Sequence, residues 1–298
     1  MRITQNMLHQ MAVDGMQTNL LRLSNTQRQA VTGKRVSRPQ DDPFAVEQSL
    51  GFRQRIKAGD SILRNVALSQ DWLNATDKAL GDMANVLTRA QSLALQGAND
   101  TLGADERASL ATEVDGLLEQ AVAIGNARHG DHYLFSGFQV NTRPFTEVKT
   151  GGETTSVTYN GDNGAMLREA EPGINITINT QGNPLLSQVF DKLIELRDNL
   201  RAAPFSTNAV SSVGADLKNQ MNQILDRQAV IGTKMRRLQT TAERVQDGQT
   251  GLKSLLSNAE DADMAQVVSD LQQQEFVYRT ALAVNAKVIN VSLLDYLR

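Results

Sequence analysis

The segment TGKRVSRPQDDP, residues 32–43, separates two long helical patterns and decides how this chain is organised. Gly33 directly follows the first pattern, and glycine commonly ends a helix because it adopts a left-handed backbone without steric penalty. Asp41 and Asp42 precede Pro43, an order typical of a cap followed by the first turn of a helix. We therefore expect one helix to end at Thr32 and the next to begin at Pro43.

The two ends of the chain resemble each other. From about Thr4 to Thr32, and again over the last forty residues, apolar side chains recur three and four positions apart, which predicts helices. Basic residues outnumber acidic ones before residue 39, whereas acidic residues outnumber basic ones after residue 258. Two separately solvated helices would explain this pattern, but so would a coiled coil of complementary charge. The apolar residues in question are Leu8, Met11, Leu20 and Leu23 near the start and Leu271, Tyr278, Leu282, Ile289, Leu293 and Leu294 near the end.

The middle of the chain is also helical, with one interruption. Residues 154–159 and 174–178 alternate between apolar and polar side chains, and a turn sequence lies between them at residues 160–164. We therefore predict a mainly α protein, a long helical rod or bundle, with a small, exposed antiparallel β domain inserted in it. The expected domains are terminal helices 1–40 and 259–298, bundle halves 41–137 and 185–258, and a β insert at 138–184.

Composition limits the chemistry that this chain can perform. It has no cysteine, which excludes disulfides and thiolate ligands, and its 30 basic and 33 acidic residues nearly balance. We find no nucleotide-binding loop, zinc motif or catalytic constellation, so we predict no catalytic residue, cofactor or metal, and no nucleic-acid or membrane partner. His129-Gly130-Asp131-His132 is interpreted as a helix-ending turn. The acidic cluster Glu260-Asp261-Ala262-Asp263 is interpreted as the start of a helix.

Three segments carry a resemblance to a known family. Residues 32–43, with Gly33, Asp41, Asp42 and Pro43, resemble the turn after the first helix of the bacterial flagellin family. Two further segments are similar to the branch of that family that joins the flagellar hook to the filament. They are Tyr133-Leu134-Phe135-Ser136-Gly137, followed by Pro144-Phe145, and the ending Ser292-Leu293-Leu294-Asp295-Tyr296-Leu297. The resemblance covers residues 1–137 and 185–298, whereas the β insert carries no recognisable motif.

This resemblance implies a structural subunit exported through the flagellar channel, with paired terminal helices in an inner tube and the β domain outside. The implied partners are further copies in a ring, the other hook-associated junction protein, flagellin, and an export chaperone on the C-terminal helix. The apolar residues of the terminal helices would form the assembly interface. Filament flagellin remains an alternative, as does a helical signalling or adaptor module, which would need sustained heptads and an adaptor motif at its tip.

Overall fold

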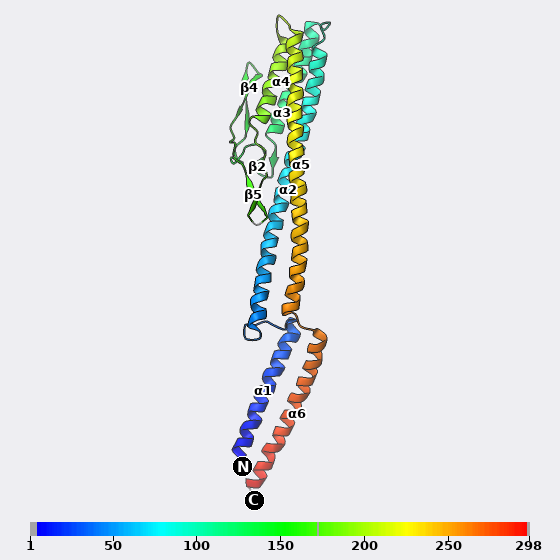
Figure 1. The fold of residues 1–298 in the computed structure, drawn as a ribbon. Coiled ribbons are helices and arrows are strands. Elements are labelled where there is room, and N and C mark those ends of the chain that lie inside the picture. Colours follow the sequence, from blue (N-terminus) through cyan, green and yellow to red (C-terminus); the bar gives the residue numbers. More distant parts are fainter. Residues whose placement is uncertain (1–4, 172, 297–298) are drawn as a thin grey trace. The chain divides into compact units, whose positions relative to one another are not determined.

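The computed structural model describes the backbone of residues 5–171 and 173–296, and side chains at residue 7 and residues 10–171 and 173–286. Figure 1 shows long helices with a small β region beside them, the predicted fold class. In chain order the elements are α1 (Gln5–Thr32), α2 (Pro43–Gly97), α3 (Ala104–Gly125), β1 (Arg128–His129), β2 (His132–Tyr133), β3 (Phe145–Thr150), β4 (Glu153–Tyr159), β5 (Leu167–Glu171), β6 (Ile174–Thr177), α4 (Leu185–Arg201), α5 (Thr207–Glu260) and α6 (Met264–Tyr296).

The chain forms two compact units. The terminal unit contains the residues up to Ala58 and those from Asp247 onward, and the central unit contains Gly59–Gln246. Both α2 and α5 contribute to each unit. No helix among the described residues has an apolar run long enough to cross a membrane.

The predicted end of α1 and the predicted start of α2 are confirmed. Gly33 has φ +68°, and its N–H donates to the carbonyl of Gln29 over 2.8 Å, which closes α1. At the start of α2, Asp42 Oδ1 accepts the backbone N–H of Ala45 over 3.1 Å. This bond satisfies one of the free donors of the first helical turn.

The central unit is held by an aliphatic core. The long helices α2 and α5 each supply a buried stripe, and α3 and α4 contact each other. Leu80, Leu87, Leu193 and Leu217 are completely buried. With only 4% aromatic residues in the chain, leucine, valine and isoleucine supply most of the buried surface that stabilises the unit.

The β region differs from the prediction in extent and in burial. Among the described strands there are three antiparallel two-stranded pairs, β1–β2, β3–β4 and β5–β6, and the first begins at Arg128. The His129–His132 segment is therefore a β-hairpin and not a helix-ending turn. Phe145 at the base of β3 is fully buried, with its ring 4.9 Å from that of Phe190 on α4. The insert is thus anchored in the helical core, and the prediction of a simply exposed domain is wrong on this point.

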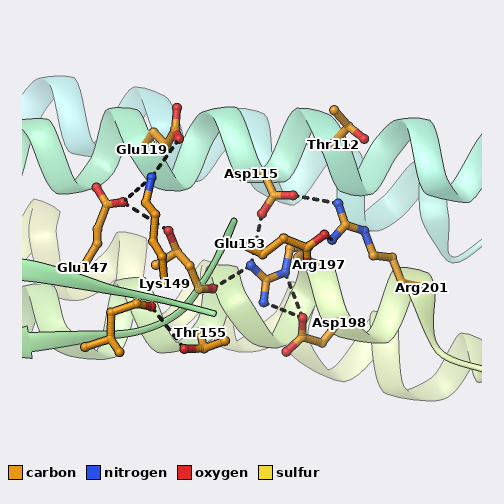
Figure 2. Close-up of polar contacts among 12 residues, drawn as sticks. Thr112, Asp115, Glu119, Glu147, Lys149, Glu153, Thr155, Arg197, Asp198 and Arg201 are labelled. Carbon is orange, nitrogen blue, oxygen red and sulfur yellow. Dashed lines mark hydrogen bonds and ion pairs between the residues drawn. The ribbon is translucent and has the colours of Figure 1, made fainter. Parts of the chain in front are cut away.

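A buried arginine also attaches the β3–β4 hairpin to α4. The side chain of Arg197 is 3% exposed, and Nη1 donates to the carbonyl of Thr154 over 2.7 Å and to Asp115 over 3.1 Å (Figure 2). Its Nε and Nη2 donate to Asp198. A buried guanidinium is tolerated only with such partners, since its desolvation is costly.

Three further ion pairs lie near this arginine in Figure 2. Arg201 donates to Asp115 over 2.7 Å and contacts Glu153 at 2.8 Å. Lys149 on β3 contacts Glu119 on α3 at 3.4 Å. The outer half of the hairpin is therefore attached to both α3 and α4 by charge.

The motif at residues 133–137 is part of the core. Leu134, Phe135 and Ser136 are buried, and Gly137 has φ +72°. A Cβ on Gly137 would lie 2.1 Å from Asp162 Oδ1, so a larger residue does not fit there. These residues fold the base of the β region.

Candidate assembly interface on the terminal helices

The terminal helices α1 and α6 lie side by side within the terminal unit (Figure 1), as predicted. Their contact buries little apolar surface. Leu23 on α1 and Val267 on α6 are 8% and 6% exposed, whereas Val31 and Phe276 are 86% and 71% exposed. Soluble monomers rarely leave this much apolar surface uncovered along one element, so the pair presents a surface suited to association.

The predicted interface residues fall into three groups. Leu23 is buried, and Leu271 and Tyr278 are half-buried. Met11, Leu20 and Leu282 are exposed, and available to a partner. The third group lies on α1 or α6, but its side chains are outside the described part of the structure: Leu8, Ile289, Leu293 and Leu294, with the motif residues Asp295 and Tyr296. All of Leu297 is outside it as well.

A groove of about 380 Å³ runs between the two helices. Several of its residues were missed by the sequence analysis, notably Phe276 and Val284. The spacing of Phe276, Thr280 and Val284 by four residues was a signal that could have found this face. The lining is Met11, Ala12, Gly15, Met16 and Asn19 from α1 and Phe276, Val277, Thr280, Ala281, Val284 and Asn285 from α6.

Part of this groove is lined by small residues, namely Ala12, Gly15 and Ala281. A Cβ built on Gly15 meets no atom within 4 Å, so the glycine leaves open space next to the helix backbone. Glycine costs an α-helix about 1 kcal/mol relative to alanine. Alanine would therefore fit at position 15, and α1 is less stable with glycine there than it would be with alanine.

Beyond α1, the chain folds into a joint built around Glu260, the last residue of α5. The Glu260 side chain is 7% exposed, and one carboxylate oxygen contacts Lys34 Nζ while the other contacts Arg53 Nη2. A buried carboxylate needs such partners, because burying a charge without one is costly. The sequence analysis did not identify this cluster.

Backbone hydrogen bonds complete the joint. The N–H of Arg35 donates to the carbonyl of Glu260 over 2.7 Å, and the N–H of Ala262 donates to the carbonyl of Gly33 over 2.9 Å. The Arg35 guanidinium also donates to the carbonyl of Ala259 over 3.0 Å. The segment after α1 is thus tied to the segment before α6, at the point where α1 ends and α6 begins.

The turn at residues 37–41 is organised by Asp41. Its Oδ2 accepts the backbone N–H groups of Ser37 and Arg38 over 3.2 and 3.0 Å, and Oδ1 contacts Arg28 at 3.4 Å. The hydrogen bond from Ser37, the bond from Arg38 and the positive charge of Arg28 lower the pKa of the Asp41 carboxyl below its ordinary value. Asp41, like Gly33, Asp42 and Pro43, therefore has a local structural role in the motif.

Two interpretations of charge require correction. Among the side chains that the structure describes, no ion pair joins α1 to α6, and the basic and acidic ends meet at the joint through Lys34 and Glu260. The acidic cluster also has two roles. Asp263 Oδ1 accepts the N–H of Ala265 over 2.9 Å and so begins α6, whereas Glu260 belongs to the end of α5.

No group of three or more histidine, aspartate or glutamate side chains within the described part of the chain is arranged to hold a metal ion. His129 packs edge-on against Trp72 at 6.1 Å, and His132 hydrogen-bonds Asn141. The feature with a surface suited to function is the terminal helix pair.

Family models match the two ends of the chain, and known proteins match most of its length. The bacterial flagellin N-terminal helical region matches residues 3–140, and the C-terminal helical region matches residues 215–297. The flagellar hook-associated protein 3 of Salmonella typhimurium is 27% identical, and that of Escherichia coli 26%, each over 92% of this chain and 93% of the relative. A flagellin of Listeria monocytogenes is 23% identical over 95% of this chain and 94% of its own.

Solved structures share the fold. A flagellar hook-associated protein from Vibrio parahaemolyticus superimposes with a TM-score of 0.67 at 18% identity, covering 74% of this chain and all of that one. FlgL of Bacillus cereus superimposes with a TM-score of 0.60 at 22% identity, covering 70% of this chain and 99% of that one. The two matched regions coincide with the helices that meet at the joint and in the terminal pair, and the chain belongs to the bacterial flagellin family.

Proposed function

We propose that this chain is a structural subunit of the bacterial flagellum at the junction between hook and filament. One observation carries the choice of junction over filament: the two hook-associated protein 3 relatives match more closely than the Listeria flagellin does. The segment at residues 133–137 and the ending at residues 292–297 support the same choice. The subunit acts by assembly and not by catalysis.

The groove between α1 and α6 is the proposed assembly surface. Burying one large apolar side chain contributes about 1.5–3 kcal/mol, and Met11, Phe276 and Val284 are all more than half exposed in the single chain. Covering them with neighbouring copies would supply much of the association energy. We propose that the terminal segments 1–40 and 259–298 form the inner-tube domain, with residues 41–137 and 185–258 as the next layer and 138–184 outside.

The proposed partners follow from this position. Copies of this chain form a ring, the other hook-associated junction protein lies on the hook side, and flagellin lies on the filament side. An export chaperone covers the C-terminal helix before the chain leaves the cell through the flagellar export apparatus. The exposed apolar residues of α6 support a partner of this kind, because an uncovered apolar helix face favours aggregation.

Location and a deletion phenotype test the proposal. Mass spectrometry of isolated hook–basal bodies should detect this chain, whereas sheared filaments should contain it only in trace amounts. Cells without it should build hooks but release flagellin into the medium. If the chain is the bulk component of sheared filaments, the filament-flagellin alternative is correct.

The signalling or adaptor alternative makes a different prediction. Such a module would remain inside the cell and would not be found with hook–basal bodies. A β region attached through Phe145 and Arg197 occupies a large part of the central unit, where an adaptor rod would continue its helical heptads. Fractionation of cells into cytoplasm and flagellar structures distinguishes the two classes.

A further inference from the structure

The central unit contains a polar cavity of about 290 Å³ that the assembly function does not use. Its wall is formed on one side by the segment between β6 and the first turn of α4, and on the other by α5. Arg227 and Lys234, seven residues apart on α5, lie on the same face of that helix and both line the cavity.

These two cations lack acidic partners. Among the described residues, neither Arg227 nor Lys234 forms an ion pair. Lys234 Nζ donates one hydrogen bond, to the carbonyl of Thr177 over 2.8 Å, which leaves two of its three donors for another group. Asp226, the neighbour of Arg227 in the chain, lines an adjoining hollow. It forms no ion pair with Arg227 or Lys234. The cavity therefore carries uncompensated positive charge.

Burial strengthens the preference for an anion. Burial and the neighbouring charge of Arg227 both lower the pKa of the Lys234 ammonium. An anion bound between the two side chains would offset the repulsion from Arg227. It would also reduce the cost of burying the charged ammonium of Lys234.

The rest of the lining suits hydroxyl groups. Thr180, Gln181, Asn183 and Gln223 offer uncharged donors and acceptors, and Pro184 and Leu185 provide a small apolar surface. Amide and hydroxyl side chains can both donate to and accept from a sugar hydroxyl, and the apolar surface suits the C–H face of a sugar ring. A simple anion such as phosphate would use the cations and leave these groups without a role.

We propose that this cavity binds an acidic monosaccharide of the uronic acid class, with the carboxylate between Arg227 and Lys234 and the ring hydroxyls against the amide-lined wall. This inference rests on the cavity and is independent of the flagellar function. The size agrees with one sugar ring, because small-molecule sites begin at about 300 Å³.

Titration of the full chain with sodium D-glucuronate tests the proposal, with D-glucose and inorganic phosphate at the same ionic strength as comparisons. We expect saturable binding in the millimolar range, followed by amide chemical shifts confined to residues 177–185 and 223–234. Both comparison compounds should bind at least tenfold more weakly. Equal binding of phosphate would overturn the sugar assignment, equal binding of glucose would overturn the role of the cations, and no saturation by glucuronate would overturn the site.

Two matched variants locate the binding. Arg227→Gln should weaken glucuronate binding about tenfold, since charge-assisted hydrogen bonds are lost. Arg237→Gln removes the same charge from an exposed position on the same helix outside the cavity, and it should have no effect. Because the Arg227 side chain is exposed, its replacement should leave the circular dichroism spectrum unchanged. Equal losses in both variants would show a general effect of net charge and overturn the proposed site.

Discussion

Replacing Glu260 by glutamine should loosen the joint between the terminal helices. The side chain is 7% exposed and is contacted by Lys34, which is 34% exposed, and Arg53, which is 49% exposed. Breaking a fully buried ion pair costs about 3–5 kcal/mol. Because water reaches both cations here, screening reduces the expected loss to about 1–2 kcal/mol. Glutamine preserves the shape of the side chain, so the change isolates the charge.

Hydrogen exchange at single amides measures this loss where it occurs. The N–H groups of Arg35 and Ala262 donate across the joint, so their protection reports its opening free energy. In Glu260→Gln their exchange should accelerate roughly 5- to 30-fold, since about 1.4 kcal/mol corresponds to a factor of ten. Amides around Leu193, in the core of the central unit, should exchange as before.

A matched control separates the joint from a general charge effect. Glu275 lies 3.9 Å from Arg279 on α6, and both side chains are more than 40% exposed. Glu275→Gln should therefore change protection at the joint by less than about 0.5 kcal/mol. Unchanged exchange at Arg35 and Ala262 in Glu260→Gln, or an equal loss in Glu275→Gln, would refute the assignment of Glu260 as the centre of the joint.

Three further changes test other parts of the molecule. Leu282→Asp should leave the thermal transition of the central unit unchanged but prevent incorporation at the hook tip, scored by immunogold microscopy, because its side chain is exposed in the single chain. Gly137→Ala should destabilise the central unit by at least about 1–3 kcal/mol in urea unfolding, because it strains a backbone at φ +72° and meets Asp162. Burial and the charge of Asp162 raise the pKa of Tyr159 to about 12, so the free energy of unfolding should fall from pH 10 towards pH 12. Tyr159→Phe should make this fall smaller, and a difference in phenolate absorbance between the folded wild type and Tyr159→Phe below pH 11 would contradict the prediction.

Helix ends were predictable because their causes are local. Gly33 ends α1 and Pro43 begins α2 through contacts with residues a few positions away, and such signals can be read directly from sequence. The pairing of α1 with α6 was also predictable, since both ends carry incomplete apolar stripes.

Features that depend on distant contacts were not predictable in the same way. The ring of Phe145 packs against Phe190, and the Glu260 carboxylate is contacted by Lys34 in the segment after α1 and by Arg53 on α2. Neither contact leaves a spacing pattern around the residue itself. Within the terminal pair, periodicity identified the apolar residues but could not separate Leu23, which is buried, from Met11 and Leu20, which remain exposed.

The β3–β4 hairpin offers a position for labelling the assembled structure. Thr150 pairs with Glu153, so Gly151 and Gly152 form the whole connection, and both are exposed. The opposite end of the hairpin is anchored by Phe145 in the core. Ion pairs of Lys149 with Glu119 and of Glu153 with Arg201 attach the two strands to α3 and α4. Lengthening a loop costs only about 0.6 kcal/mol for each doubling. A short epitope or a fluorophore-acceptor peptide inserted between Gly151 and Gly152 should therefore be displayed without disturbing the helices, and the cysteine-free background makes a single introduced thiol there a unique attachment point.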